Sequence, residues 1–131
     1  MLRYFITTFY AASLSIMVSS VTHAQSDEAK DYLKAAEPYL TLSCQALVDT
    51  YGDDEKQMEE IITLMTAVSV INRQIDITKL LPDEADKKEF SEFMEKALMA
   101  QCEDDVDSLI AGNVDRAVAY AFTDQGEAPK E

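Results

Sequence analysis

The sequence predicts an all-α protein, a small single-domain helical bundle of four to five helices closed by one disulfide. Glycine and proline, which interrupt helices, number three each among 131 residues. The apolar residues beyond the first quarter of the chain recur at spacings of three and four rather than two, which is the periodicity of a buried helix face. The chain also carries two cysteines, Cys44 and Cys102, behind a segment typical of exported proteins, in which cysteines most often pair.

The first 24 residues have the profile of a secretory signal peptide. Arg3 precedes an apolar stretch that runs to Val18, and residues 22–24 read Thr-His-Ala, a small-residue cleavage site. The stretch is short and too rich in Ser and Thr for a membrane-spanning helix. We therefore expect an exported protein with no membrane insertion after signal cleavage. Its expected divisions are a signal peptide at 1–24, a helical domain at 25–123 and a flexible C-terminal tail at 124–131.

Composition excludes several classes of function. Cleavage after Ala24 removes Arg3 and His23 but no carboxylate, so 10 Lys and Arg face 25 Asp and Glu and the formal charge becomes −15. Such a charge repels nucleic acid and anionic lipid. Without histidine, neither a Ser-His or Cys-His nucleophile pair nor an imidazole zinc site forms. Only carboxylate chemistry of the glycoside hydrolase kind remains, and a helical domain of this size offers little room for a substrate cleft. We therefore expect no enzyme activity and no cofactor.

The first two helices are short and end at residues that break helices. Ser26 is a candidate N-cap with Asp27 in the first turn, and Pro38 ends the helix or bends the chain soon after Glu37. Its apolar positions are Ala29, Tyr32, Leu33, Ala36 and Tyr39. The second helix stops at Gly52. Its apolar positions are Leu42, Cys44, Leu47, Val48 and Tyr51.

The third helix is expected from about Glu55 to Asn72, after Asp53 and Asp54, which are good helix initiators. Small side chains in its middle let another helix approach closely. These are Thr63, Thr66, Ala67 and Ser69. Residues 74–81 alternate apolar and polar positions, and we expect them to be extended or a loop with apolar anchors.

The last two helices complete the bundle. Pro82 suits the first turn of the fourth helix, along which apolar residues at helical spacing lead to Cys102 on or beside the buried face. A fifth helix is expected from about Asp107 to Thr123. Gly112 lies inside it at a cost of about 1 kcal/mol relative to Ala, which leaves open whether the helix is kinked or split there.

The two cysteines are expected to form one structural disulfide. Cys44 and Cys102 are 58 residues apart, and the chain-entropy relation gives about 4 kcal/mol of stabilisation for a loop of that length. The bond would tie the second helix to the end of the fourth and enclose the third. Redox catalysis is a poorer reading, because it normally uses two cysteines that are close in sequence.

Four carboxylates directly follow the second cysteine. Two thiols are too few soft ligands for a metal site, and calcium is the better ionic alternative because it prefers hard oxygen ligands. The run lacks the alternating Asp pattern and the turn glycine of a calcium loop. We therefore expect a water-facing helix start with no bound metal. The carboxylates are those of Glu103, Asp104, Asp105 and Asp107.

The segments around the cysteines resemble a known family. They read Cys44-Gln-Ala-Leu-Val on one side and Leu98-Met-Ala-Gln-Cys on the other. After the second cysteine, Ile110, Val114 and Val118 recur every four residues. In an exported helical chain of this size, these features resemble the HdeA/HdeB family of periplasmic acid-stress chaperones. The resemblance covers about residues 40–122.

The resemblance implies an HdeA-like domain that acts as an ATP-independent holdase. Such a protein is folded and usually a homodimer at neutral pH, and acid loosens it so that buried apolar surface becomes available to unfolding periplasmic client proteins. Methionines and aromatic residues at helical spacing are candidates for that adaptable surface, or they are plain core. The candidate client-binding or dimer surface consists of Met58, Ile61, Ile62, Met65, Phe90, Phe93 and Met94.

Acid changes the charge of this chain strongly. Between pH 7 and pH 2 the formal charge would pass from about −15 to about +10, because the carboxylates take up protons near pH 4. A carboxylate whose pKa is lower in the folded than in the unfolded state stabilises the fold above the unfolded pKa. That stability is lost as the pH falls through the folded pKa.

A rival function is that of a periplasmic inhibitor or immunity-type protein. Its acidic face would bind one basic partner at neutral pH in a salt-sensitive way. A holdase, in contrast, would bind many unrelated clients only after acidification.

Overall fold

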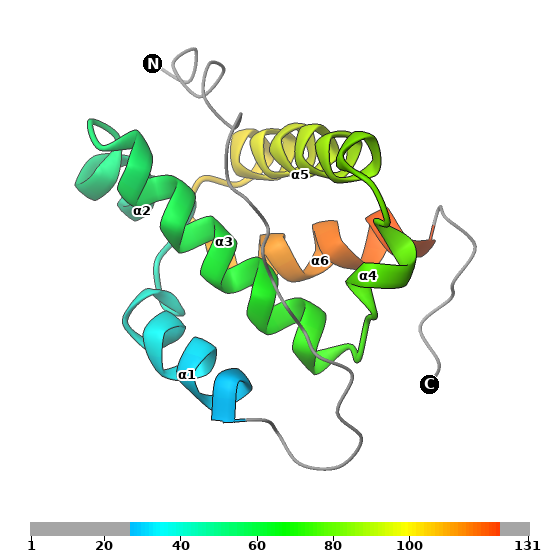
Figure 1. The fold of residues 1–131 in the computed structure, drawn as a ribbon. Coiled ribbons are helices and arrows are strands. Elements are labelled where there is room, and N and C mark those ends of the chain that lie inside the picture. Colours follow the sequence, from blue (N-terminus) through cyan, green and yellow to red (C-terminus); the bar gives the residue numbers. More distant parts are fainter. Residues whose placement is uncertain (1–26, 124–131) are drawn as a thin grey trace.

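The computed structural model describes residues 27–123, and within that range the chain is all-α (Figure 1). Its helices are α1 (Asp27–Ala36), α2 (Cys44–Tyr51), α3 (Glu55–Asn72), α4 (Ile77–Leu80), α5 (Glu84–Asp104) and α6 (Ile110–Thr123), and a 3-10 turn, η2, spans Glu37–Tyr39. The predicted class and the predicted disulfide are confirmed. The expected signal peptide, the candidate cap Ser26 and the C-terminal tail lie outside the described residues.

Helix α3 is the centre of the fold. It runs diagonally between α1 on one side and α6 on the other, and α5 packs on α6 (Figure 1). All six residues from Met65 to Val70 are buried, including Thr66 and Ser69. A helix covered on two sides buries residues around its whole circumference. The Thr66 hydroxyl is satisfied because it donates to the Ile62 carbonyl oxygen at 2.8 Å.

The hydrophobic core is continuous from α2 through α3 and α6 to α5. Its most deeply buried large residues, less than 2 % exposed, are Leu47, Ile61, Leu81, Ile110, Val70, Val114 and Val118. Phe90 of α5 packs on Phe122 of α6 with ring centroids 5.4 Å apart. Apolar residues of four helices therefore meet in one core, as expected for a single small domain.

Side-chain caps set the helix starts. The Ser43 hydroxyl accepts a hydrogen bond from the Ala46 amide at 3.1 Å at the start of α2. The Asp54 carboxylate does the same for α3, where it accepts from the Gln57 amide at 3.0 Å. Each cap satisfies an amide that has no partner within the helix. The third helix has the predicted bounds, because its cap residues are visible in the sequence.

The prediction for residues 74–81 was wrong in part. The segment contains a single helical turn, α4, rather than an extended strand or an open loop. Gln74 turns the chain with a φ of 55°, and the Asp76 carboxylate accepts from the Thr78 amide at 3.1 Å. The hydrogen bond from the Thr78 side chain is the main reason that the pKa of Asp76 is lowered. The turn buries Ile77 and Leu81 against the core.

Two expected helix starts were also wrong. Pro82 lies outside α5, because Asp83 is the N-cap and accepts from the Asp86 amide at 3.0 Å. The last helix begins at Ile110 rather than near Asp107. The Ile110 amide donates to the Leu42 carbonyl at 2.9 Å, so the residues before it pair with the start of α2 instead of extending the helix.

The acid-rich stretch is therefore a helix end and a connection, not a helix start. Glu103 and Asp104 are the last residues of α5, and Asp105 is its C-cap. All of these carboxylates, and that of Asp107, are exposed. Negative charge at a helix C-terminus opposes the helix dipole, so these residues do not stabilise α5 at neutral pH.

The glycines have two different roles. Helix α6 is continuous through Gly112, and a Cβ there would meet nothing within 4 Å. Gly52, which ends α2, has a φ of −59° and is not left-handed. A Cβ at Gly52 would collide with the Val48 carbonyl oxygen. Close approach, rather than backbone conformation, is thus the reason for glycine at the end of α2.

Candidate functional site

The disulfide joins the first residue of α2 to the last turn of α5. Cys44 and Cys102 have Cα atoms 5.6 Å apart and are 58 residues apart in sequence. The covalent loop contains α3 and α4, whereas α1 precedes it and α6 follows it. Opening of α1 or α6 therefore does not require the disulfide to break.

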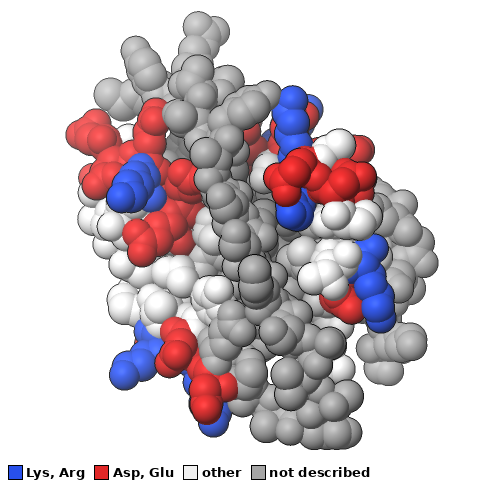
Figure 2. Space-filling view, viewed as in Figure 1, with Lys and Arg blue, Asp and Glu red and all other residues white. Residues whose placement is uncertain are grey.

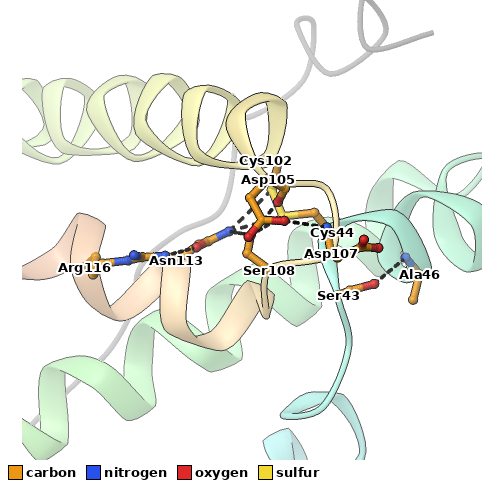
Figure 3. Close-up of a disulfide and its surroundings, with 9 residues drawn as sticks. All are labelled: Ser43, Cys44, Ala46, Cys102, Asp105, Asp107, Ser108, Asn113 and Arg116. Atoms are coloured by element: carbon orange, nitrogen blue, oxygen red, sulfur yellow. Dashed lines mark hydrogen bonds between the residues drawn. A yellow bond between two sulfur atoms is a disulfide. The ribbon is translucent and has the colours of Figure 1, made fainter.

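A buried asparagine anchors α6 to this disulfide (Figure 3). The Asn113 side chain is fully buried, and its amide nitrogen donates to the Ser108 hydroxyl oxygen at 2.8 Å. The same nitrogen lies 3.2 Å from the Cys44 sulfur and 3.7 Å from the Cys102 sulfur. Its amide oxygen accepts from the Arg116 guanidinium. Both ends of the buried amide are thus satisfied, as burial requires.

Sequence reasoning missed Asn113. The available signal was a single polar residue on the apolar face of the last helix, between Ile110 and Ala117, which are themselves buried. Such a residue needs a fixed partner. Its partners come from α2 and from the α5–α6 connection, which the sequence does not place.

Backbone hydrogen bonds hold the α5–α6 connection against the start of α2. The Cys44 amide donates to the Ser108 carbonyl and the Gln45 amide donates to the Val106 carbonyl, each at 2.9 Å. Ser43 and Leu109 form an antiparallel bridge. The connection leaves two apolar side chains in solvent, because Val106 is 47 % and Leu109 is 50 % exposed.

An ion pair joins the C-terminal end of α3 to α6. The Arg73 guanidinium donates to both Asp115 carboxylate oxygens, from Nε at 2.9 Å and from Nη2 at 2.8 Å. The buried Ser69 hydroxyl donates to the same carboxylate at 2.7 Å. Hydrogen bonds from Arg73, followed in importance by that of Ser69, lower the pKa of Asp115, against the opposing effect of burial. The hydrogen bond to Asp115 raises the pKa of Arg73.

The predicted client-binding or dimer residues lie in the core of the folded chain. Six of the seven are buried, and Phe93 is half-buried against the same core. The buried residues are Met58, Ile61, Ile62, Met65, Phe90 and Met94. They form no exposed patch in this state, so a role in client binding requires the helices to separate and stays a prediction.

The acidic connection is organised by local hydrogen bonds. The Asp105 carboxylate accepts a hydrogen bond from the Asp107 amide at 3.1 Å. The backbone carbonyl oxygen of Asp105 accepts one from the Ser108 hydroxyl at 2.6 Å. Among residues 27–123, no three Asp, Glu, His or Cys side chains converge as metal ligands would. Nor is any helix in this range long and apolar enough to span a bilayer.

In comparisons with known proteins, no family model, no curated protein and no solved structure matches the chain. The resemblance to acid-stress chaperones therefore rests on the short segments around the two cysteines and on the last helix.

Proposed function

We propose that this chain is a periplasmic, ATP-independent acid-stress chaperone of the HdeA/HdeB kind. In this proposal it is a holdase that exposes apolar surface at low pH and prevents the aggregation of unfolding client proteins. The observation that carries the proposal is the ion pair between Arg73 and Asp115, which ties the central helix α3 to α6. It is a contact that acid removes.

The direction of the pH effect follows from the lowered pKa of Asp115. Protonation is harder in the folded than in the unfolded chain, so the ionised carboxylate stabilises the fold above the unfolded pKa, about 3.9. This contribution is lost as the pH falls through the lower, folded-state pKa. Arg73 stays charged throughout, so below that pH it keeps its charge and loses its partner.

The rest of the surface adds to this effect. Asp and Glu outnumber Lys and Arg by 25 to 11 in the whole chain, and Figure 2 shows groups of acidic side chains around one face with fewer basic ones among them. In strong acid the carboxylates become neutral and the lysines and arginines remain charged. The molecule then carries only positive charge, whose mutual repulsion destabilises a compact state.

The disulfide supports a limited opening rather than complete unfolding. It keeps α2 attached to the end of α5 in acid, with α3 held in the loop between them. The apolar residues of α3 and α5 would then be exposed on a chain that is still constrained. Refolding after neutralisation begins from a restricted ensemble, because the closed loop has already lost conformational entropy.

The test is a pH titration of the oxidised protein from pH 7 to pH 2. Light scattering follows the mass, apolar-dye fluorescence follows exposed surface, and the turbidity of an acid-unfolding reporter protein follows holdase activity. We expect loss of a dimer, increased dye binding and suppressed turbidity below about pH 4. A compact species that binds no dye and suppresses no turbidity down to pH 2 contradicts the proposal.

A second candidate function is inhibition of a single basic partner at neutral pH. The observation that favours it is the pair of exposed apolar side chains, Val106 and Leu109, beside the carboxylates of Asp105 and Asp107. Tight binding of one partner at pH 7, weakened by salt, would favour this function over the holdase.

A further inference from the structure

The two sulfurs of the disulfide lie in different surroundings (Figure 3). Cys44 is only 3 % exposed and is the first residue of α2, whereas Cys102 is half-buried in the last turn of α5. In thiol–disulfide exchange a thiolate attacks one sulfur and the other sulfur leaves as a thiolate. The rate depends on access to the attacked sulfur and on the stability of the leaving thiolate, so unequal surroundings assign these two roles.

A buried N–H donor lies closer to Cys44 than to Cys102. The Asn113 amide nitrogen is 3.2 Å from the Cys44 sulfur and 3.7 Å from the Cys102 sulfur. The Arg116 guanidinium, which can only donate, bonds to the Asn113 amide oxygen, and this contact keeps the nitrogen directed at the disulfide. Hydrogen bonds to a charged acceptor are stronger than those to a neutral one. Negative charge that develops on Cys44 is therefore stabilised.

The helix ends act in the same direction. Cys44 follows the N-cap of α2, where the helix dipole favours a thiolate. Cys102 lies at the opposite, negative end of α5, and the exposed carboxylates of Glu103 and Asp104 come directly after it. These charges oppose a thiolate at Cys102. Access and electrostatics thus agree, because the more exposed sulfur is also the poorer leaving group.

We propose that Cys102 is the sulfur at which a thiol enters this disulfide, that Cys44 is the sulfur that leaves, and that the entering thiol carries positive charge beside it. The entering thiolate forms a bond to the Cys102 sulfur, the bond to the Cys44 sulfur breaks, and its electron pair stays on Cys44 as a thiolate. One thiolate is consumed and one is produced, so electrons and charge balance without another reactant. The exposed carboxylates of residues 103–105 and of Asp107 repel an anionic thiol and attract a cationic one.

The first test locates the entering thiol on the wild-type protein. The oxidised chain, folded at pH 8, is mixed with excess cysteamine, and N-ethylmaleimide stops the reaction early, before a second thiol reacts. Peptide mass spectrometry then shows which cysteine carries cysteamine and which carries maleimide. We expect about tenfold more cysteamine on Cys102 than on Cys44. Equal labelling, an excess on Cys44, or no adduct on the folded chain overturns the assignment.

The same measurement in urea separates the fold from the neighbouring residues. Glu103 and Asp104 stay beside Cys102 when the chain unfolds, whereas the Asn113 amide and the start of α2 no longer act on Cys44. The excess of cysteamine on Cys102 should therefore fall several-fold once circular dichroism shows that the helices are lost. An unchanged excess overturns the assignment of Cys44 as a leaving group selected by the fold.

The charge of the entering thiol is tested by comparing cysteamine with 3-mercaptopropionate. Each rate is divided by that of the same thiol with bis(2-hydroxyethyl) disulfide, so that the thiols' own reactivities cancel. Cysteamine should be favoured several-fold at low salt and much less at about 1 M salt. A peptide with cysteine between two lysines identifies the source: its reaction at Cys102 indicates a protein thiol, and reaction of cysteamine alone indicates a small molecule.

Matched variants connect this preference to the carboxylates. The double variant Glu103→Gln, Asp104→Asn removes two exposed charges beside Cys102 and should reduce the preference for cysteamine about twofold or more. Glu89→Gln removes a charge from the same helix about 20 Å away and should leave the preference unchanged. Equal normalised rates for the two thiols, or an equal effect of the near and distant variants, overturns the requirement for a cationic thiol.

Discussion

Replacement of Asp115 by asparagine tests the acid-labile link between α3 and α6. Asparagine mimics the protonated carboxyl group in size and loses its charge. The side chains of Arg73 and Asp115 are 26 % and 48 % exposed, and partly exposed ion pairs contribute about 0.2–1 kcal/mol. The hydrogen bond from buried Ser69 contributes about 0.5–1.5 kcal/mol, of which asparagine retains a part. We expect Asp115→Asn to lower the free energy of unfolding by about 1 kcal/mol at pH 7.

The difference should depend on pH in one direction. Asp115 has a lowered pKa in the folded chain, so its contribution is complete above the unfolded pKa of about 3.9 and disappears as the pH falls through the folded-state value. The free energies of unfolding of wild type and Asp115→Asn should therefore converge in acid.

The assay is urea unfolding followed by circular dichroism at several pH values between 7 and 2.5. Glu89→Gln is the control, since Glu89 is an exposed residue within α5 and its replacement removes the same charge. A deficit of Asp115→Asn that persists undiminished in acid, or that is no larger than that of Glu89→Gln at pH 7, refutes the reasoning.

Three further predictions concern stability. Replacement of both Cys44 and Cys102 by alanine should lower the free energy of unfolding by about 4 kcal/mol, which is the contribution expected from the entropy lost on closing a 58-residue loop. A loss below about 1 kcal/mol in urea unfolding would contradict that account. Gly112→Ala should raise the thermal midpoint and add up to about 1 kcal/mol to the free energy of unfolding, because the new Cβ meets no neighbour. Gly52→Ala should lower the midpoint, because its Cβ would collide with the Val48 carbonyl oxygen. Equal effects of the two substitutions would show that close approach is not the reason for Gly52. Asn113→Leu should cost about 1–3 kcal/mol, because it removes the buried amide that contacts the half-buried Ser108 hydroxyl and the disulfide. Unchanged urea unfolding would show that Asn113 does not anchor α6.

Local signals in the sequence predicted most helices and their bounds. The third helix, from Glu55 to Asn72, was predicted at both ends because Asp54 caps it and its apolar residues follow a helical period. The end of the second helix at Gly52 was predicted as well, although the reason is close approach to Val48 rather than a left-handed conformation. In these cases the decisive contacts lie within four residues of each other.

Prediction was weaker where distant segments meet. The start of α6 depends on a hydrogen bond between the Ile110 amide and the Leu42 carbonyl, and the sequence of residues 107–110 does not indicate that contact. The acid-rich stretch was misplaced on a helix start for the same reason. Candidate surface residues such as Met58 and Met94 could be chosen by type and spacing, but only their neighbours show that both are buried in the core.

The sequence by itself determined the all-α class, the central helix and the disulfide, since helical periods and caps are local and two cysteines allow a single pairing. The tertiary structure alone decided that Asp115 pairs with Arg73, 42 residues away, and that Asn113 contacts Cys44, 69 residues away. Neither pair has a sequence signature, because each depends on the angle and distance at which separate helices pack. Helices α1 and α6 lie outside the covalent loop because of their order in the sequence, but only the packing placed them on opposite sides of α3.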